Sequence, residues 1–267
     1  MAKHVRSRRP SPLYWLALFF FALVFLVSGG LLLHRLWQDS RVQADFETLE
    51  QQILPAPADT AAGADNTDRF AAITAMNPDF IGWISIEDTG VSFPVMYSPD
   101  RPDFYLRHNF SGEYSDSGTP YLDAACTLTD QRRSNNLIIY GHNMRTGTIF
   151  GPLTEYKKPE TYRDHPIVRL DTLYGDGAYE VFAAFAIDVV EDPDFAYNTY
   201  VDMDEAAFAS FVSQVKARSD VDSGITPVYG DELLTLSTCE YSSPNGRYVV
   251  CARRLADGAE GTGDLDS

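Results

Sequence analysis

The sequence predicts a mostly β domain that follows a single membrane-spanning helix. Two observations predict this organisation. From Leu13 to Leu33 the chain carries no charged residue over 21 positions, and from Phe80 onward it consists of short apolar runs separated by Gly, Pro, Asn and Asp. Short apolar runs bounded by turn-forming residues are typical of β-strands. A chain of 267 residues accommodates one soluble domain of about 200 residues beside such a helix.

The apolar segment 13–33 is long enough to cross a bilayer, because a helix of 21 residues rises about 30 Å, the thickness of the hydrocarbon core. Basic residues without an acidic neighbour precede it: Lys3, Arg6, Arg8 and Arg9. Positive charge marks the cytoplasmic side, so we expect residues 1–12 in the cytoplasm and the rest outside the cell. A cleaved signal peptide is an alternative because Ser28 to Gly30 are small, although signal apolar regions usually run about 7–15 residues. A buried core helix is a further alternative.

Composition and cysteine count limit the classes of function. Apart from the four N-terminal basic residues, the chain has 17 Lys and Arg against 38 Asp and Glu, a formal charge of −21. Nucleic-acid affinity comes mainly from basic residues that neutralise phosphates, so we expect no nucleic-acid role. Three cysteines are an odd number, so an exported chain must keep one thiol free or pair it between chains. No Cys/His cluster has zinc-ligand spacing, and we expect neither a metal nor a cofactor.

Residues 34–76 are predicted to form a helical extension with a linker. Apolar residues recur at helical spacing over 41–53, which predicts a short amphipathic helix. The stretch from Pro55 to Arg69 is poor in bulky apolar residues and is expected to be a flexible linker. A second short helix is predicted over 70–76.

The strands follow from there, with one helix late in the chain. The predicted strands, expected to form a mostly antiparallel sheet or barrel, are FIGWISI, VSFPVMY, TPYLDA, NLIIYG, IVRL, YEVFAAFAIDVV, LLTLST and RYVVCA. Asp202 and Glu205 match a variant of the capping box, which predicts a helix over 202–218. Its buried stripe is expected to be Phe208, Phe211, Val212 and Val215. The Gly- and Asp-rich tail 256–267 is expected to be disordered.

The stretch from Leu233 to Leu255 predicts a β-hairpin with reactive groups on both sides of its turn. A strand ends at Cys239, the turn Pro244-Asn245-Gly246 reverses the chain, and Arg247 opens the next strand. The turn makes Cys239 and Arg247 neighbours, so a thiol and a guanidinium can face one cleft. Cysteine acts as a nucleophile only as thiolate, which a nearby cation favours. A small buried cysteine beside a surface arginine gives the same pattern, so the pair alone decides little.

His142 is the histidine best placed to complete such a site. It follows the apolar strand NNLIIYG and precedes a polar, glycine-containing loop, and a rigid strand end beside an accessible loop is a typical position for a functional group. Of the others, His4 and His34 flank the apolar segment, His108 lies in a loop, and His165 precedes a proline. A structural role remains the alternative for any single histidine.

TLSTC, RYVVCAR and the upstream GHN together resemble the sortases, and specifically the class B branch. The resemblance covers about 180 residues, through NPDFIGWISI, FPVMYS, YLRHNFSG, SGTPYLD and IIYGHN to the final hairpin. It implies an eight-stranded barrel over 77–255 with one additional helix between late strands. The N-terminal helical extension is a further class B trait.

The resemblance implies a cysteine transpeptidase anchored in the cell membrane by one helix, with its catalytic domain outside. Cys239 would attack the Thr carbonyl of an NPxTx-like C-terminal sorting signal and form a thioester. His142 would transfer protons and Arg247 would stabilise the oxyanion. The thioester would pass to an amine of a peptidoglycan precursor, which anchors a surface protein to the cell wall, or of a pilin.

The resemblance also implies roles for further residues. Ser237 and Glu240 match positions that line the class B substrate groove. Tyr140, Asn143 and Asn109 are further candidates for substrate binding, with an ordinary core role as the alternative for Tyr140.

Cys251 departs from the pattern of the resemblance, because strand alternation puts it on the same face as Arg247. It is either core filler or the partner of Cys126 in a disulfide. Two other functions stay open at this point. A papain-like cell-wall hydrolase shares a Cys–His pair, but its usual order puts Cys first, on a helix. A non-catalytic, membrane-tethered binding module is the second.

Overall fold

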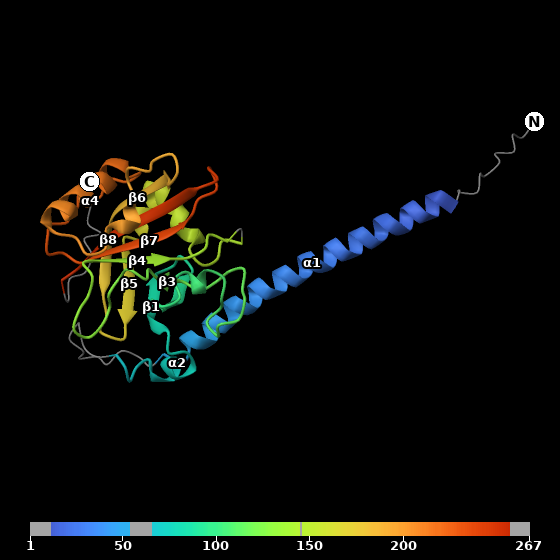
Figure 1. Cartoon of the computed structure of the whole chain (residues 1–267), viewed down its shortest axis with the longest axis horizontal. Helices are drawn as coiled ribbons and strands as arrows, with labels where there is room; N and C mark the ends of the chain where they lie inside the picture. Colours follow the sequence, from blue (N-terminus) through green and yellow to red (C-terminus); the bar gives the residue numbers. More distant parts are fainter. Residues whose placement is uncertain (1–11, 54–65, 145, 257–267) are drawn as a thin grey trace, which may run out of the picture. The chain divides into compact units, whose positions relative to one another are not determined.

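The computed structural model describes residues 12–53, 66–144 and 146–256, with the backbone alone for 31–43 (Figure 1). The basic N-terminal tail up to residue 11, most of the expected linker (54–65) and the acidic tail from 257 lie outside the described residues. The chain divides into two compact units, Met1–Asp45 and Phe46–Ser267.

Helix α1 (Pro12–Glu50) contains the apolar segment and most of the amphipathic helix predicted over 41–53. Residues Pro12–Gly30 have a mean hydropathy of 2.1 and are not buried inside the protein, as for a membrane anchor or a signal sequence. In the second unit the last turns of α1 contact the barrel. Phe46 is buried edge-on against Phe93, with ring centroids 5.4 Å apart, and Glu50 Oε1 accepts a hydrogen bond from Ser92 Oγ at 2.6 Å.

Eight strands close into a barrel in the order β1-β2-β3-β4-β7-β8-β6-β5. Each of the eight predicted runs overlaps one strand: β1 (Phe80–Ile86), β2 (Val91–Met96), β3 (Tyr121–Leu122), β4 (Asn136–Tyr140), β5 (Ile167–Thr172), β6 (Ala178–Asp188), β7 (Leu233–Cys239) and β8 (Gly246–Arg254). Neighbouring strands are antiparallel except for β2–β3 and β4–β7, which are parallel. Closure leaves no unpaired sheet edge, and the β4–β7 pairing joins segments that are far apart in the sequence.

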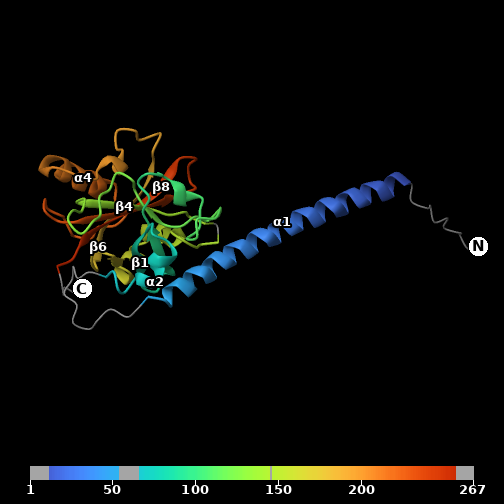
Figure 2. The same cartoon turned by 60° about the horizontal axis from the view of Figure 1, so that its bottom comes forward.

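One short helix precedes β1, and the others lie in the connections between strands. They are α2 (Ala71–Met76), which lies beside β1 in both views (Figures 1 and 2), η1 (Phe104–Leu106), η2 (Gly151–Lys157), α3 (Pro159–Asp164) and η3 (Tyr197–Thr199). The long connection between β6 and β7 carries η3 and then the longest helix of the second unit, α4 (Glu205–Arg218). Helix α4 lies outside the barrel and contacts β6 (Figure 2).

The predicted stripe of α4 is confirmed, but the predicted cap is wrong. Phe208, Phe211, Val212 and Val215 are buried in one apolar cluster with residues of β6 and β8. The N-cap is Asp204, whose carboxylate accepts a hydrogen bond from Ala207 N at 2.8 Å. Asp202 instead pairs with Arg132 at 2.8 Å. The helix cap thus lies two residues after the predicted one, because an exposed aspartate can form an ion pair as well as cap a helix.

Two asparagines at the start of β4 fasten the β6–β7 connection to the barrel. Asn135 exchanges two hydrogen bonds with the backbone of Met203, at 2.7 and 3.0 Å. Asn136 is fully buried and donates from its side chain to the Tyr200 carbonyl at 2.7 Å. These bonds satisfy buried backbone groups of a segment without regular pairing, and they hold η3 over the face of β7.

Candidate active site

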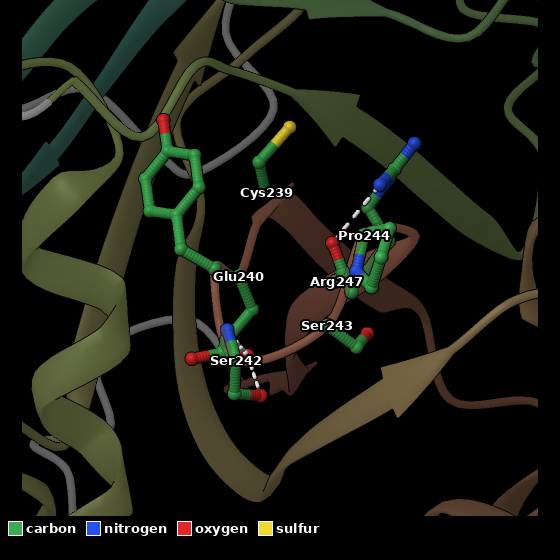
Figure 3. A pocket seen from close by; sticks show the side chains of 8 residues that line it. Cys239, Glu240, Ser242, Ser243, Pro244 and Arg247 are labelled. Carbon is green, nitrogen blue, oxygen red and sulfur yellow. Dashed lines mark hydrogen bonds between the residues drawn. The ribbon is translucent and has the colours of Figure 1, made fainter.

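Cys239 and Arg247 lie opposite one another on β7 and β8, at the end of the hairpin next to its turn. They are paired residues in the antiparallel register. Both line a pocket formed by Cys239, Glu240, Tyr241, Ser242, Ser243, Pro244, Gly246 and Arg247. Figure 3 shows the Cys239 thiol and the Arg247 side chain extending to the same side of the hairpin, away from Ser242. The sequence prediction of a hairpin that brings these two groups to one cleft is confirmed.

The three cysteines lie in different environments. Cys239 is partly exposed, whereas Cys126 and Cys251 are buried. Burial raises the pKa of the Cys126 and Cys251 thiols to about 12, so both stay protonated at neutral pH. A nucleophilic cysteine must reach its substrate as thiolate. Of the three thiols, Cys239 is therefore the one suited to react.

The possible disulfide between Cys126 and Cys251 is absent, because all three cysteines are free. The Cys126 sulfur lies 3.7 Å from the Asn136 carbonyl oxygen and accepts a hydrogen bond from Ile138 N at 3.4 Å. The Cys251 sulfur lies 3.8 Å from Thr235 Oγ1, on the paired strand. Each thiol thus fills a different part of the core, which is the alternative interpretation of Cys251.

The parallel pairing of β4 with β7 brings the His142 segment beside Cys239. Tyr140 pairs with Ser237, and Gly141 N donates to the Ser237 carbonyl at 3.1 Å. Two residues after Gly141 and Ser237 in their segments, Asn143 Nδ2 donates to the Cys239 carbonyl at 2.9 Å. Cys239 therefore lies between the segment that carries His142 and the strand that carries Arg247.

The His142 ring is held by the backbone of η1. Its Nε2 lies 2.7 Å from the Leu106 carbonyl oxygen. A carbonyl oxygen can only accept, so Nε2 carries a proton and Nδ1 is left for other partners. Burial lowers the pKa of His142, and the bond to Leu106 opposes that shift. The ring is therefore mostly neutral near pH 7, with a proton that is easily transferred once acquired.

Two donors of the pocket share one acceptor. Arg247 Nη1 donates to the Gly246 carbonyl at 2.9 Å, and Glu240 N donates to the same oxygen at 3.0 Å. The guanidinium and the amide that follows the thiol thus converge on a carbonyl oxygen. Donors that converge in this way are the arrangement that stabilises negative oxygen in acyl transfer.

The residues predicted to bind substrate differ in how far they are buried and in their hydrogen-bond partners. Ser237 is buried, and its Oγ lies 2.7 Å from the hydroxyl of Tyr197 in η3. Tyr140 is partly buried, with its hydroxyl donating to Asp123 Oδ2 at 2.7 Å. The Glu240 carboxylate lines the pocket and accepts from Ser242 N at 2.8 Å.

Asn109 lies in the loop between η1 and β3. Its backbone and side chain form bonds with the backbone of Glu113, at 2.8 and 2.9 Å. The pocket lining does not include it.

Sequence reasoning missed two contacts of this site. Tyr197 covers Ser237, yet nothing in the spacing around it distinguishes it from the chain's other tyrosines. The Leu106 carbonyl holds His142, and a backbone carbonyl leaves no signature in the sequence. Only the fold brings either group to its partner.

The chain is similar to known sortases in sequence. A family model described as the sortase domain matches residues 84–255. A sortase B from Listeria monocytogenes is 28% identical over 229 residues, covering 85% of this chain and 90% of the relative. A sortase B from Staphylococcus aureus is 27% identical over 233 residues, covering 86% and 92%.

Solved structures agree in fold. A Staphylococcus aureus sortase B–substrate complex superposes with a TM-score of 0.72 at 26% identity, covering 82% of this chain and 98% of that one. A crystal structure of sortase B complexed with triglycine superposes with a TM-score of 0.71 at 27% identity, covering 81% and 98%. These proteins share the closed barrel described above.

Proposed function

Because this chain belongs to the sortase family, as a cysteine transpeptidase of class B, we propose that it cleaves a C-terminal sorting signal at Cys239 and transfers the product to an amine. The observation that supports this site is the placement of Cys239 between Arg247, its partner across the hairpin, and the segment that carries His142. Papain-like chemistry on a helix-borne cysteine does not fit, because Cys239 ends a strand of a closed barrel.

Cys239 gives its thiol proton to the neutral His142 ring, and the resulting thiolate attacks the carbonyl carbon of the Thr residue in the sorting signal. A tetrahedral intermediate forms and collapses to a thioester as the amine of the next residue leaves. His142, as imidazolium, gives this amine its proton and afterwards removes a proton from the incoming amine. The low pKa of the ring favours release of the proton in the first step.

Arg247 stabilises the oxyanion of the tetrahedral intermediate. Its guanidinium already donates to a carbonyl oxygen, that of Gly246, and a substrate carbonyl is the same kind of acceptor. Interactions that strengthen as charge develops on this oxygen lower the barrier rather than only binding the substrate. In the proposed reaction, Arg247 therefore gives up its hydrogen bond to the Gly246 carbonyl and donates to the substrate oxygen instead.

The substrate class is a sorting-signal peptide, NPxTx-like, on a surface protein. One related structure holds a substrate and another holds triglycine, which supports a peptide donor and an amine acceptor. Glu240, Tyr140, Asn143 and Asn109 are proposed contacts of the donor peptide. Ser237 is a proposed contact only after Tyr197 moves, because Tyr197 covers its hydroxyl.

The acceptor is proposed to be an amine of a peptidoglycan precursor, with a pilin amine as the alternative. Helix α1 supports a location at the cell membrane. We propose a single pass, with the N-terminus in the cytoplasm and the barrel outside, because the residues before the apolar segment are basic.

The test is incubation of the full chain, in detergent micelles, with a library of sorting peptides and triglycine, followed by mass spectrometry. We expect a ligated product and a thioester adduct on Cys239. Cys239→Ala should abolish both, whereas Cys126→Ala should keep the adduct. Cleavage without ligation at any amine concentration would indicate a hydrolase, and turnover by Cys239→Ala would remove this thiol from the mechanism.

A further inference from the structure

Tyr105 is the buried residue of η1, the short helix whose backbone holds His142. Its side chain is buried, with the whole residue only 2% exposed. The next residue, Leu106, supplies the carbonyl oxygen that lies 2.7 Å from His142 Nε2. The position of this carbonyl therefore depends on how firmly the neighbouring Tyr105 is held.

The Tyr105 hydroxyl forms two hydrogen bonds with the segment that joins α2 to β1. Asn77 Nδ2 donates to it at 2.9 Å, and it donates to Asp79 Oδ2 at 2.8 Å. Burial raises the pKa of Tyr105 to about 12, so the hydroxyl keeps its proton at neutral pH and can donate. Asp79 N in turn donates to Asn77 Oδ1 at 2.9 Å. The two residues that hold the hydroxyl are thus also bonded to each other.

This segment is itself fixed to the barrel. Asp79 directly precedes β1, and its carbonyl oxygen accepts a hydrogen bond at 2.7 Å from the amide of Tyr97, which directly follows β2. The Asp79 carboxylate also forms an ion pair with Arg101. The Tyr105 hydroxyl therefore connects η1 to the ends of two paired strands.

The backbone of η1 is held as well by the chain that leads into β3. Thr119 N donates to the Tyr105 carbonyl at 2.9 Å. Gly118 has a φ of +59°, and a Cβ at this position would lie 2.6 Å from the carbonyl oxygens of both Tyr105 and Leu106. Only glycine permits this conformation together with so close an approach. The Leu106 carbonyl therefore has little room to move toward Gly118.

We propose that Tyr105 is a positioning residue for the transpeptidation reaction, whose hydroxyl fixes η1 so that the Leu106 carbonyl orients the His142 ring. The inference rests on the proposed role of His142 in proton transfer. With Nε2–H bound to a fixed carbonyl, the ring presents Nδ1 to the thiol and to the leaving amine. A ring that turned freely would present Nδ1 for only part of the time, which slows both proton transfers.

The bond to Leu106 also affects the protonation of His142. Burial lowers the pKa of the ring, and the bond to the Leu106 carbonyl raises it, because a cationic ring donates more strongly. The charged groups that act on the ring are Arg107, which lowers its pKa, and Asp116, which raises it, both in the loop between η1 and β3. A weaker bond to Leu106 should therefore lower the pKa of His142 further.

The experiment measures thioester formation with a sorting peptide by full-length chains in detergent micelles, as a function of pH. Tyr105→Phe removes only the hydroxyl. Asp79→Ala removes the acceptor of that hydroxyl at a partly exposed position. Tyr179→Phe is the matched control, because Tyr179 is also buried and its hydroxyl accepts from Arg133. Tyr179 pairs with Arg254, at the opposite end of β8 from the reacting groups.

We expect Tyr105→Phe to lower the acylation rate at saturating peptide about tenfold, with KM within about threefold. Because the neutral ring accepts the thiol proton, the acid limb of kcat/KM reports the pKa of His142 in the free enzyme. This limb should move to lower pH in Tyr105→Phe and in Asp79→Ala. Tyr179→Phe should keep the acid limb in place and stay within about twofold in rate.

Three results would overturn the inference. They are an acylation rate for Tyr105→Phe within about twofold of the unmodified chain, a slower rate with an unmoved acid limb, and an equal loss of rate in Tyr179→Phe. The last two would indicate a general loss of folded protein rather than a misplaced ring. If Tyr105→Phe does not fold, Asp79→Ala replaces it, and unchanged acylation there overturns the inference. Absence of thioester in the unmodified chain would instead contradict the proposed function.

Discussion

The side-chain amide of Asn143 donates a hydrogen bond to the backbone carbonyl of Cys239, with 2.9 Å between Nδ2 and the oxygen. The Asn143 carbonyl in turn accepts from the Tyr241 hydroxyl. These two bonds join the loop after β4 to the residues on both sides of Glu240. They fix the peptide unit that follows the thiol against Asn143, the residue after His142.

Asn143→Ala should slow thioester formation about tenfold, because the Cys239 peptide loses a bond that orients it. Tyr241→Phe should have a smaller effect, since it leaves the Asn143–Cys239 bond in place. Single-turnover acylation of the full chain by a sorting peptide measures both. Gln131→Ala, which removes an exposed amide side chain, is the control. Equal rates for Asn143→Ala and this control would contradict the orienting role.

Alkylation should separate the three thiols. Native chain treated with iodoacetamide at about neutral pH should be labelled at Cys239, because Cys126 and Cys251 are buried and keep a pKa of about 12. Mass spectrometry of tryptic peptides locates the label. In denaturant all three should react at similar rates. Labelling of Cys126 or Cys251 in the native chain as fast as Cys239 would show that the barrel opens around them.

Acidification should destabilise the barrel in part through His142. Burial lowers its pKa in the folded protein below the ordinary 6.5, so below that pH the unfolded chain binds a proton that the folded chain does not. Its contribution therefore reduces stability as pH falls through 6.5 toward the folded-state pKa, and is absent above 6.5.

His142→Gln should consequently lose less stability than the unmodified protein between about pH 7.5 and about pH 5. Urea unfolding of the compact unit that begins at Phe46 measures the difference. Identical pH dependence in the two proteins would show that the imidazole keeps its ordinary pKa when folded.

Gly246→Ala should destabilise the hairpin and slow acylation together. A Cβ at this position would collide with the Glu240 carbonyl oxygen and lie 3.0 Å from Ser243 Oγ. The hairpin must open to admit it, at a cost of about 1–3 kcal/mol, as for other overpacked sites. Urea unfolding measures the loss. Asn245→Ala is the control, because Asn245 is exposed and the change leaves its backbone bonds in place. Equal stability of the two variants would contradict the close approach.

The sequence alone predicted most of the local structure. Each predicted apolar run overlaps a strand, because the alternation of side chains and the turn residues depend on only a few neighbours in the sequence. The turn Pro244-Asn245-Gly246 predicted the Cys239–Arg247 pairing for the same reason, since a short turn fixes the register of the strands that it joins. A local pattern does not show which of two nearby residues of the same type caps a helix. Asp202 and Asp204 both precede α4, and in the structure Asp204 caps the helix whereas Asp202 pairs with Arg132.

What the sequence determined by itself is therefore the strands, the buried stripe of α4, the apolar segment and, through its resemblance to a family, the reacting residue types. The tertiary structure decided which cysteine is accessible, which carbonyl holds His142, and that the Asn143 side chain bonds to the Cys239 carbonyl. These relationships depend on the parallel β4–β7 pairing and on closure of the barrel. Such contacts join segments distant in the chain, and burial of whole sheet faces selects them rather than any local pattern of residues.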